Sequence, residues 1–571
     1  MILVFGGTTE GRNAVEVLEE AGKPYYYSTK TGEQNITLHH GHRIDGALDE
    51  EAMQAFCREK DIRLIVDAAH PFASQLHSTI ARVSEILDIP VVRYERIYPP
   101  RDLSLTWIDD YSQVPTDIHS LLTTTGVQSI SRLKWLEERE IKVVYRILNR
   151  DSSIRLAHQQ GATEDQLCFY PHTVEAEAVL LKESGESGGF SEKVAEAKEK
   201  GMRIIVLKRP QLPVDNSRWS VVNGPYGLRR AVEKLLPEFY PLHSGLTTGT
   251  CATAAAVAQT LRVTKGEMPD EVPVVLPDGE TIRVAVGYGE GYACCVKEAG
   301  DDPDVTNGIE IRAEVKPAET FEILGGKGVG IFTLPGFDYP PGSPAINKAP
   351  RQMMRQNINQ NVRITICVEG GEEIARRTFN PRLGIEGGIS IIGVSGIVKP
   401  FSEEAFIDSI RKCMTVAKAS GSERVVINSG GKSERFVKAL YPNLPQQAFV
   451  EYGNYIGETL KMANDLHFKN VTLGVMLGKA VKLASGHLDT HSRKATMDKH
   501  FIRQMLEEAH IDVDLSEMML ARELWDKIPQ ESLQRFAATI IGHCAEHCIP
   551  LLPNGILTIL LIDDNGKIYE I

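Results

Sequence analysis

The first 22 residues restrict the fold more than any other segment of the chain. Residues 2–5 are an unbroken apolar run that ends at Gly6 and Gly7, as a buried parallel strand does. The next apolar residues recur at the spacing of one helix face: Ala14, Val17, Leu18 and Ala21. A strand that passes through glycines into an amphipathic helix predicts an α/β fold with a mostly parallel sheet.

The same alternation of strand and helix continues to about residue 240. Further strands are expected at residues 25–27, 63–67, 90–93, 121–123, 142–145, 178–181 and 203–207. Helical segments lie between them, for example at 74–87 and 192–200. This organisation predicts two Rossmann-like lobes, at about residues 1–112 and 113–240.

The character of the sequence changes near residue 241, where a proline and a glycine follow an acidic helix. Short strands and glycine-rich turns dominate up to about residue 400, and the helix–strand rhythm returns from Ser402. We therefore expect a second domain over residues 243–571, with an α+β region at about 243–400 and an α/β region at 401–571.

The charge balance narrows the classes of ligand. The chain of 571 residues holds 63 basic and 76 acidic residues, a net charge of −13, which argues against a nucleic-acid binder and a polybasic membrane-surface protein. No cationic leader precedes the first apolar run, and no stretch of 18 apolar residues occurs. Because the nine cysteines are few and scattered, we expect reduced thiols in a cytoplasmic protein. The oligomeric state stays open.

The glycine-rich turn after the first strand has the context of a dinucleotide-binding loop, in which backbone N–H groups meet a phosphate. The candidate cofactor-binding residues there are Gly6, Gly7, Thr8, Thr9, Glu10, Gly11 and Arg12. Thr8 replaces the second glycine of the usual fingerprint, so a tight turn that binds nothing is the alternative. Ser28, Thr29 and Lys30 after the second strand suit NADPH better than NADH, since no acidic residue stands there.

His70 is a further cofactor-site candidate. It follows the apolar strand at 63–67 at its C-terminal end, where ligands gather in open α/β sheets. A capping or surface histidine is the alternative interpretation.

Three features of the second half carry possible chemistry. Thr248, Gly249 and Thr250 start an alanine-rich helix and offer an anion or cofactor site. Asp301 and Asp302 could bind a metal or act as a general base, or could simply cap a turn. The helical cluster His543, Cys544, His547 and Cys548 has zinc-ligand residue types. Its two i, i+4 pairs point about 100° apart, so we favour packed helix residues and expect no metal.

The N-terminal motifs together resemble a known family. GGTTEGR at residues 6–12, DAAHPFA at 67–73, RYER at 93–96 and KESG at 182–185 are similar to the precorrin-6A and cobalt-precorrin-6A reductases of cobalamin biosynthesis. The resemblance spans about residues 1–240 and implies that a reduced nicotinamide delivers hydride to a tetrapyrrole macrocycle held between two lobes. Such substrates carry many carboxylates. The candidate substrate-binding residues are Arg93, Arg96, Arg146, Lys182 and Ser184.

The C-terminal half carries a second resemblance, over about residues 243–500. GLTTGTCATAAA at 245–256, AGDDPDVT at 299–306, NPRLGIEGGISIIG at 380–393 and THSR at 490–493 are similar to the cobalt-precorrin-5B (C-1) methyltransferases. This family transfers a methyl group from S-adenosylmethionine to a ring carbon. The base candidates are His491, Asp301 and Asp302, and the substrate-binding candidates are Arg382, Thr490, Ser492 and Arg493.

The two resemblances fall on consecutive reactions, because the product of the methyltransferases is the substrate of the reductases. The sequence therefore predicts a bifunctional enzyme of cobalamin biosynthesis that uses S-adenosylmethionine and NADPH or NADH. The alternative is an active methyltransferase whose N-terminal half is a non-catalytic, dinucleotide-binding regulatory module.

Overall fold

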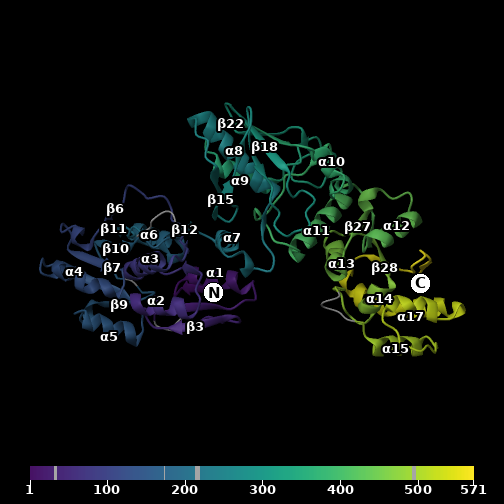
Figure 1. Ribbon diagram of the computed structural model, residues 1–571, viewed down its shortest axis with the longest axis horizontal. Coiled ribbons are helices and arrows are strands. Elements are labelled where there is room, and N and C mark those ends of the chain that lie inside the picture. The colour runs from purple at the N-terminus through teal and green to yellow at the C-terminus, as the bar shows by residue number, and fades with distance from the viewer. Residues whose placement is uncertain (31–34, 173, 213–218, 492–496, 571) are drawn as a thin grey trace. The chain divides into compact units, whose positions relative to one another are not determined.

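A computed structural model describes residues 1–30, 35–172, 174–212, 219–491 and 497–570 (Figure 1). The chain forms two compact units. One comprises Met1–Ser244 with Pro273–Arg283, and the other comprises Gly245–Val272 with Val284–Ile571.

The first lobe of the N-terminal unit is built on a parallel six-stranded sheet. Its strand order is β12 (Trp219–Val222), β5 (Val91–Tyr94), β4 (Leu64–Asp67), β1 (Ile2–Phe5), β2 (Tyr25–Thr29) and β3 (Gly41–Asp45). The chain runs outward from β1 to β3 and then returns to place β4 on the other side of β1. The carboxyl ends of β1 and β4 therefore form a topological switch point, where α/β sheets bind ligands.

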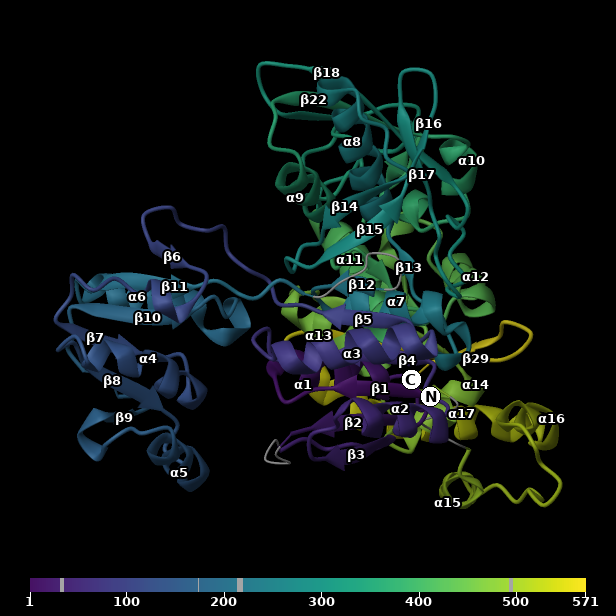
Figure 2. The ribbon, with the colours of Figure 1, turned by 60° about the vertical axis from the view of Figure 1, so that its left-hand side comes forward.

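Helices cover both faces of this sheet, as Figure 2 shows for the first lobe. The helices on one face are α1 (Thr9–Glu19) and α7 (Pro225–Leu235), and those on the other are α2 (Glu50–Glu59) and α3 (Ser74–Leu87). Ala14 and Leu18 of α1 are fully buried against the sheet, which is the face that the apolar periodicity predicted. Apolar packing on both faces of the sheet thus fixes the position of the loop that follows the carboxyl end of β1.

The second lobe repeats the architecture. Its parallel sheet has the order β6 (Thr106–Ile108), β11 (Arg203–Leu207), β10 (Ala178–Lys182), β7 (Ser120–Thr123), β8 (Lys142–Ile147) and β9 (Leu167–Phe169). Its helices are α4 (Ile130–Glu137), α5 (Asp151–Gln159) and α6 (Phe190–Glu199). The switch point lies between β7 and β10.

The lobe boundaries differ from those expected at residues 1–112 and 113–240. β6 comes before residue 112 yet pairs with β11 of the second lobe, whereas β12 comes after residue 207 and pairs with β5 of the first. Leu228 and Val232 of α7 are fully buried in the first lobe's core. Local patterning could not reveal this exchange, because the apolar pattern of a strand does not determine which sheet the strand joins.

A hairpin from beyond the expected domain boundary completes the N-terminal unit. β14 (Glu271–Val275) and β15 (Thr281–Ala285) pair with each other, and residues 273–283 pack with this unit. The Glu280 carboxylate accepts hydrogen bonds from the backbone N–H groups of Tyr226 (3.1 Å) and Gly227 at the start of α7. A Cβ at Gly224 would lie only 2.3 Å from this carboxylate. The hairpin thus supplies the cap that the sequence around α7 lacks.

The Glu280 cap makes the stability of the N-terminal unit depend on pH. Burial raises the pKa of Glu280 to about 7, above the value of about 4.3 for an unfolded glutamate. A raised carboxyl pKa gives a contribution to stability that is present below the unfolded pKa and is lost as pH rises through 7. We expect the urea midpoint of this unit to fall between pH 5 and 8, and to fall less in Glu280→Gln.

The measurement is tryptophan fluorescence during urea unfolding in a Trp525→Phe background. The other three tryptophans, Trp107, Trp135 and Trp219, all belong to the N-terminal unit. An equal pH dependence in both proteins would contradict the prediction.

The α+β region of the second unit packs a long helix against a mostly antiparallel sheet. The helix is α8 (Thr248–Lys265). The sheet order is β16 (Gly287–Tyr288), β17 (Ala293–Val296), β18 (Glu310–Pro317), β22 (Val362–Val368) and β19 (Glu322–Gly325), with only β19 parallel to its neighbour. Small alanine side chains along α8 allow it to approach the sheet closely, and residues 248–260 of the helix are all buried.

The last region is α/β. Its sheet has the order β27 (Phe449–Glu451), β26 (Arg424–Asn428), β28 (Asn470–Met476), β29 (Ile556–Ile562) and β30 (Ile568–Tyr569), and only β30 is antiparallel. The helices around it are α11 (Glu403–Ala419), α12 (Gly431–Leu440), α13 (Ile456–Asp465), α14 (Leu477–Ala484), α15 (Lys499–Glu508) and α17 (Leu533–Cys548). The chain reverses between β26 and β28, so this sheet too has a switch point.

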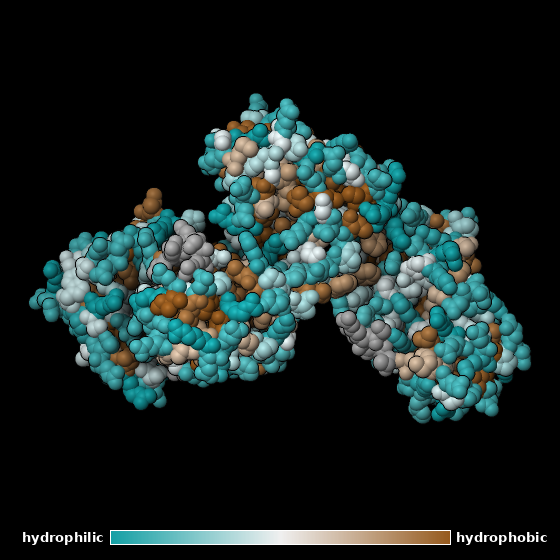
Figure 3. Space-filling view, viewed as in Figure 1, coloured by the Kyte–Doolittle hydropathy of each residue, from teal (hydrophilic) through white to brown (hydrophobic). Residues whose placement is uncertain are grey.

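No helix among the described residues is long and apolar enough to span a bilayer. The face of the molecule drawn in Figure 3 is mainly hydrophilic, with scattered hydrophobic patches.

Candidate functional site

A cleft of about 1840 Å³ runs between the two lobes of the N-terminal unit. The loops at both switch points contribute to its lining. From the first lobe come Gly6, Gly7, Thr8, Thr9, Arg12, Ser28, Thr29, His70 and Arg96, and from the second come Tyr111, Gln128, Arg132, Lys182 and Arg209. Five of the seven residues predicted in the glycine-rich turn therefore line the cleft, and Glu10 and Gly11 do not.

The side chain of Thr8 fixes the turn after β1 through two hydrogen bonds. Its Oγ1 accepts from the N–H of Gly11 (3.0 Å) and donates to the carbonyl of Ala68 (2.7 Å), which ties the β1 loop to the β4 loop. A Cβ at Gly6 would lie 2.1 Å from the hydroxyl oxygen of Tyr27, so only glycine fits there. The resulting bare backbone beside the N-terminus of α1 suits the pyrophosphate of a dinucleotide.

The cleft carries more positive than negative charge although the chain is acidic. Nine basic side chains of the described residues line it: Arg12, Lys30, Arg82, Arg96, Arg132, Arg150, Lys182, Lys208 and Arg209. Four described acidic side chains do so: Asp49, Glu50, Asp109 and Asp110. The excess favours polyanionic ligands such as a phosphorylated dinucleotide or a polycarboxylate.

A buried ionic network lies directly beneath the β4 loop. Asp67, fully buried at the end of β4, contacts Arg93 Nη1 (3.0 Å) and His77 Nδ1 (2.7 Å). Burial alone would raise the pKa of Asp67, but His77 and Arg93 hold it below its usual value. Arg93 also donates to the carbonyl of Ala69 (2.9 Å), and His77 Nε2 faces the carbonyl of His70 (3.1 Å). The network therefore fixes the backbone of the loop.

His70 is the ring that this loop presents to the cleft. Its Nδ1 accepts a hydrogen bond from the backbone N–H of Phe72 (3.2 Å), which leaves Nε2 as the protonated nitrogen of the neutral ring. Burial, with Arg96 and Lys182 nearby, lowers the pKa of His70 to about 3. His70 is thus a neutral hydrogen-bond donor suited to an oxygen of a bound ligand.

The predicted substrate-binding residues of the N-terminal half separate into two groups. Arg96 and Lys182 line the cleft. Arg93 does not, because its buried guanidinium is committed to Asp67 and Glu95. Arg146 and Ser184 are also outside the lining; Arg146 lies 3.7 Å from Glu196, and the Ser184 hydroxyl donates to the carbonyl of Gly188. For these three side chains, the geometry favours a role in positioning over direct contact with substrate.

His77 was missed by the sequence reasoning. Its position in the first turn of the helix at 74–87, five residues after Phe72, was a signal that it could face the strand end. Only the fold shows that Asp67 is the residue it meets.

Removing one partner of a buried ion pair leaves the other charge without compensation, which costs about 3–5 kcal/mol. We expect Arg93→Met to lower the free energy of unfolding of the N-terminal unit by about that amount. Arg203→Met is the matched control, since the Arg203–Asp117 pair is exposed and is worth about 0–1 kcal/mol. Urea unfolding in the Trp525→Phe background measures both, and equal effects would contradict the assignment.

The predicted cofactor loop at Thr248, Gly249 and Thr250 forms hydrogen bonds with another segment of the same chain. Thr248 Oγ1 accepts from the N–H of Ile392 (2.9 Å), Gly249 N–H donates to the carbonyl of Ile392 (2.9 Å), and Thr250 Oγ1 donates to the carbonyl of Gly396 (2.6 Å). The segment at 390–396 therefore supplies hydrogen-bond partners for the polar groups at the start of α8. This packing argues against the expected cofactor role, because the polar groups that would meet an anion already have partners.

The base candidates come from separate segments. Asp301 and Asp302 lie in the turn after β17, where Asp302 accepts from the backbone N–H of Phe401 (3.0 Å). His491 follows Thr490, whose backbone N–H donates to the carbonyl of Asn454 (3.0 Å). Ser492 and Arg493 lie outside the described residues.

A buried ion pair near the aspartate turn was not predicted. Lys297 Nζ lies 2.6 Å from Asp304, and the lysine side chain is 1% exposed. Burial opposes ionisation of Asp304, but Lys297 and Thr306 hold its pKa below the usual value. This pair fixes the turn that carries Asp301 and Asp302.

A second cluster of polar groups gathers at the switch point of the α/β region. Glu451 ends β27, and a Cβ at Gly430, in the loop after β26, would lie 2.3 Å from its carboxylate. Arg382 Nη2 pairs with Glu434 (2.8 Å), while Nη1 lies 3.7 Å from Glu451. Nη1 is buried and has no hydrogen-bond partner among the described residues.

Burial shifts the pKa values of two side chains in this cluster. Burial raises the pKa of Glu451, against the opposing effect of Arg382. Burial also lowers the pKa of Lys479, at the start of α14, to about 8, although its Nζ donates to the carbonyl of Gly453. The cluster fits a ligand with hydroxyl and carboxylate groups. It offers an unsatisfied N–H of Arg382, the carboxylate of Glu451 and the glycine turn at the start of α12.

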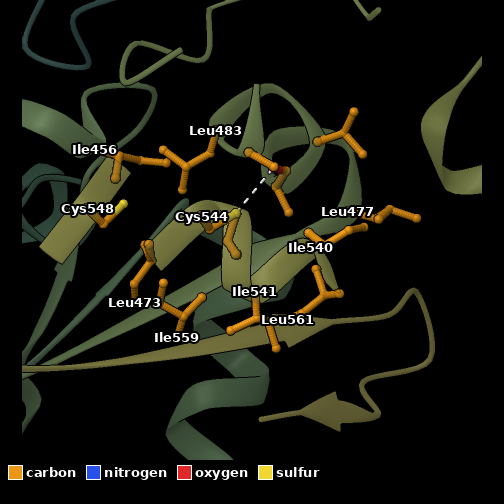
Figure 4. Packing of buried hydrophobic residues seen from close by; sticks show 14 of the residues in the cluster. Ile456, Leu473, Leu477, Leu483, Ile540, Ile541, Cys544, Cys548, Ile559 and Leu561 are labelled. Carbon is orange, nitrogen blue, oxygen red and sulfur yellow. Dashed lines mark hydrogen bonds between the residues drawn. The ribbon is translucent and has the colours of Figure 1, made fainter. Parts of the chain in front are cut away.

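The histidine–cysteine cluster on α17 divides between the core and the surface. Cys544 and Cys548 are fully buried among apolar side chains, and Cys544 Sγ donates to the carbonyl of Ala480 (Figure 4). His543 instead faces Glu508 at 2.6 Å. Among the described residues, no group of three or more His, Cys, Asp or Glu side chains is placed to hold a metal ion.

Comparison with known proteins matches both halves of the chain. Residues 237–400 match the family described as CbiD, and residues 1–224 match the family described as precorrin-6x reductase CbiJ/CobK. A cobalt-precorrin-5B C(1)-methyltransferase of Prosthecochloris aestuarii is 41% identical over 345 residues, which cover 56% of this chain and 94% of that protein. One from Geobacillus sp. is 39% identical and covers 53% and 88%.

The chain belongs to the cobalt-precorrin-5B C(1)-methyltransferase family. It carries in addition an N-terminal CbiJ/CobK reductase segment, so the expected pairing of the two enzymes on one chain is confirmed. Among solved structures, CbiD of Archaeoglobus fulgidus is 28% identical, covers 47% of this chain and 85% of its own, and gives a TM-score of 0.26. A CobK precorrin-6A reductase is 16% identical, covers 41% and 96%, and gives a TM-score of 0.34.

Proposed function

We propose that this chain carries out two consecutive steps of corrin-ring synthesis. The C-terminal unit methylates C-1 of cobalt-precorrin-5B with S-adenosylmethionine, and the N-terminal unit then reduces the resulting cobalt-precorrin-6A to cobalt-precorrin-6B with NADPH. The observation that carries the proposal is the presence of both family segments on one chain, with a basic cleft in the reductase segment.

In the reductase, NADPH supplies the hydride, and the protein binds and orients both ligands. The backbone at Gly6 and Gly7 and the N-terminus of α1 hold the pyrophosphate, and Ser28 and Thr29 lie at the end of β2 where the adenosine ribose belongs. His70 donates from Nε2 to an oxygen of the nicotinamide or the macrocycle. Arg132, which also lines the cleft, binds a carboxylate of the substrate. Arg96 can donate to a substrate carboxylate only from Nη2, because its Nε pairs with Glu10 and its Nη1 donates to the carbonyl of Ser184.

In the methyltransferase, S-adenosylmethionine supplies an electrophilic methyl group. We place its ribose at Glu451 and its carboxylate near the start of α12, at Gly430 and Gly431. Arg382 remains the candidate for a substrate carboxylate, because its Nη1 still has an N–H to donate. Asp301, Asp302 and His491 remain candidates for the base, and Thr490, Ser492 and Arg493 for substrate contacts.

The regulatory alternative for the N-terminal half is not favoured, since that half matches a reductase family over nearly its whole length. A second observation against it is the size of the cleft, about 1840 Å³, which exceeds the range of about 300–1,000 Å³ typical of a single small-molecule site.

The test follows the absorbance of the macrocycle in two stages. With cobalt-precorrin-5B and S-adenosylmethionine alone, we expect a methylated product that accumulates. Addition of NADPH should then change the macrocycle spectrum with loss of one NADPH per macrocycle. A chain that methylates but leaves both the spectrum and NADPH unchanged would support the regulatory alternative.

The placement of the methyl donor predicts a selective binding defect. Glu451→Gln removes the charged acceptor for the ribose hydroxyls, so we expect S-adenosylhomocysteine to bind at least about tenfold more weakly, a loss of about 1.4 kcal/mol. Isothermal titration calorimetry measures this, with NADPH affinity unchanged in the same protein. Glu458→Gln is the matched control, because Glu458 is an exposed carboxylate paired with Lys461 on α13. Unaltered affinity in Glu451→Gln would place the ligand elsewhere.

A further inference from the structure

Reduction of a carbon–carbon double bond by hydride also consumes a proton. The hydride forms one C–H bond, and the electron pair displaced toward the neighbouring carbon must take a proton from another source. A side chain that lies in the cleft within reach of the macrocycle can supply this proton as a general acid.

Most of the acidic hydrogens in the cleft are poor candidates. Arginine guanidinium groups do not release protons in proteins. His70 is neutral, as its low pKa and its hydrogen bond from Phe72 require. Burial raises the pKa of Tyr111 and so weakens it as an acid. Lys208 is held by the carboxylate of Asp109 at 3.0 Å.

Lys182 differs from these groups in its surroundings. It is the last residue of β10, at the switch point of the second lobe, and its Nζ lies 4.9 Å from the centre of the Phe72 ring in the β4 loop of the first lobe. Among the described residues its ammonium group has no ion pair or hydrogen bond. The next residue, Glu183, binds Arg101 (2.9 Å) and the backbone N–H of Arg209 (3.0 Å), so it does not neutralise Lys182.

We propose that Lys182 is the proton donor of the reductase reaction. The inference rests on the proposed reductase function and assigns to this lysine a role beyond binding a carboxylate. The Nζ–H bond of Lys182 breaks, and its proton bonds to the carbon adjacent to the one that accepts the hydride. Lys182 is left as a neutral amine, and water returns a proton to it after the product leaves.

The charged and titratable groups that face Lys182 favour this role. Arg132 on α4 is near enough to disfavour a second positive charge, and His70 on the β4 loop is neutral. Arg96, also in the lining, is paired with Glu10 at 3.0 Å. Burial, together with Arg132, lowers the pKa of Lys182 to about 8. The donor is therefore protonated at pH 7 and loses its proton as pH rises through 8, so the rate of hydride transfer should fall on that alkaline limb.

The test compares Lys182→Arg, Lys182→Met and Lys182→Ala with wild type in single-turnover reduction of cobalt-precorrin-6A. Lys182→Arg keeps the positive charge but cannot release a proton. We expect all three to slow hydride transfer by about 10²–10⁴-fold at pH 7, the usual contribution of a general acid. NADPH affinity, measured by fluorescence titration, should change less than about threefold. Lys198→Met is the control, since the Lys198 side chain is exposed, does not line the cleft and pairs with Asp102.

Two further readouts separate proton donation from charge alone. Methylamine should restore part of the rate in Lys182→Ala, and the alkaline limb near pH 8 should disappear in Lys182→Met. NMR of ¹³C-methylated lysines in the free protein should find one resonance, absent in Lys182→Arg, that titrates near pH 8.

A wild-type rate in Lys182→Arg, or titration of Lys182 above pH 10, would overturn the proposal. Failure of wild type itself to reduce cobalt-precorrin-6A would instead overturn the proposed reductase function.

Discussion

The buried pair of Asp67 and Arg93 is the interaction on which the reductase site depends. Neither side chain is exposed, so each charge is tolerable only because the other is present. Through Arg93 and His77 the pair holds the carbonyls of Ala69 and His70, and the same loop carries the Phe72 ring beside Lys182. The ends of β4 and β10 thereby face one cleft in a defined geometry.

The charge of the chain and the charge of its site have opposite signs. A net charge of −13 opposes the approach of a polycarboxylate, yet the described lining of the cleft is basic. Local fields decide binding once a ligand enters a confined, weakly screened site. The acidic composition of the chain therefore gave no information about the ligand. The arginines that the two switch points bring together in the cleft indicate an anionic one.

Local patterns predicted the elements well because each depends on neighbouring residues. The helix expected at 74–87 is Ser74–Leu87, and the strand expected at 203–207 is Arg203–Leu207. Long-range pairing was not predictable in this way. The exchange of β6 and β12 between lobes and the capping of α7 by Glu280 join residues far apart in the sequence.

The same distinction applies to the candidate site. Glycines at a strand–helix turn and a histidine after a strand were recognisable, because the backbone conformation there follows from the local sequence. Arg93 and Thr248 were predicted to contact ligands. In the structure Arg93 pairs with Asp67, and Thr248 forms hydrogen bonds with the segment at 390–396. A polar residue's partner depends on tertiary packing, and the sequence alone could not tell a partner within the protein from a ligand.

The most direct measurement of the central claim is a double isotopic label on one macrocycle. The intact chain is given cobalt-precorrin-5B, S-adenosylmethionine with a ¹³C-methyl group, and NADPH deuterated at the transferred position of C4. Mass spectrometry should find single product molecules that carry both the labelled methyl group and one deuterium. A product that carries the methyl label but never deuterium would contradict a chain with two catalytic activities.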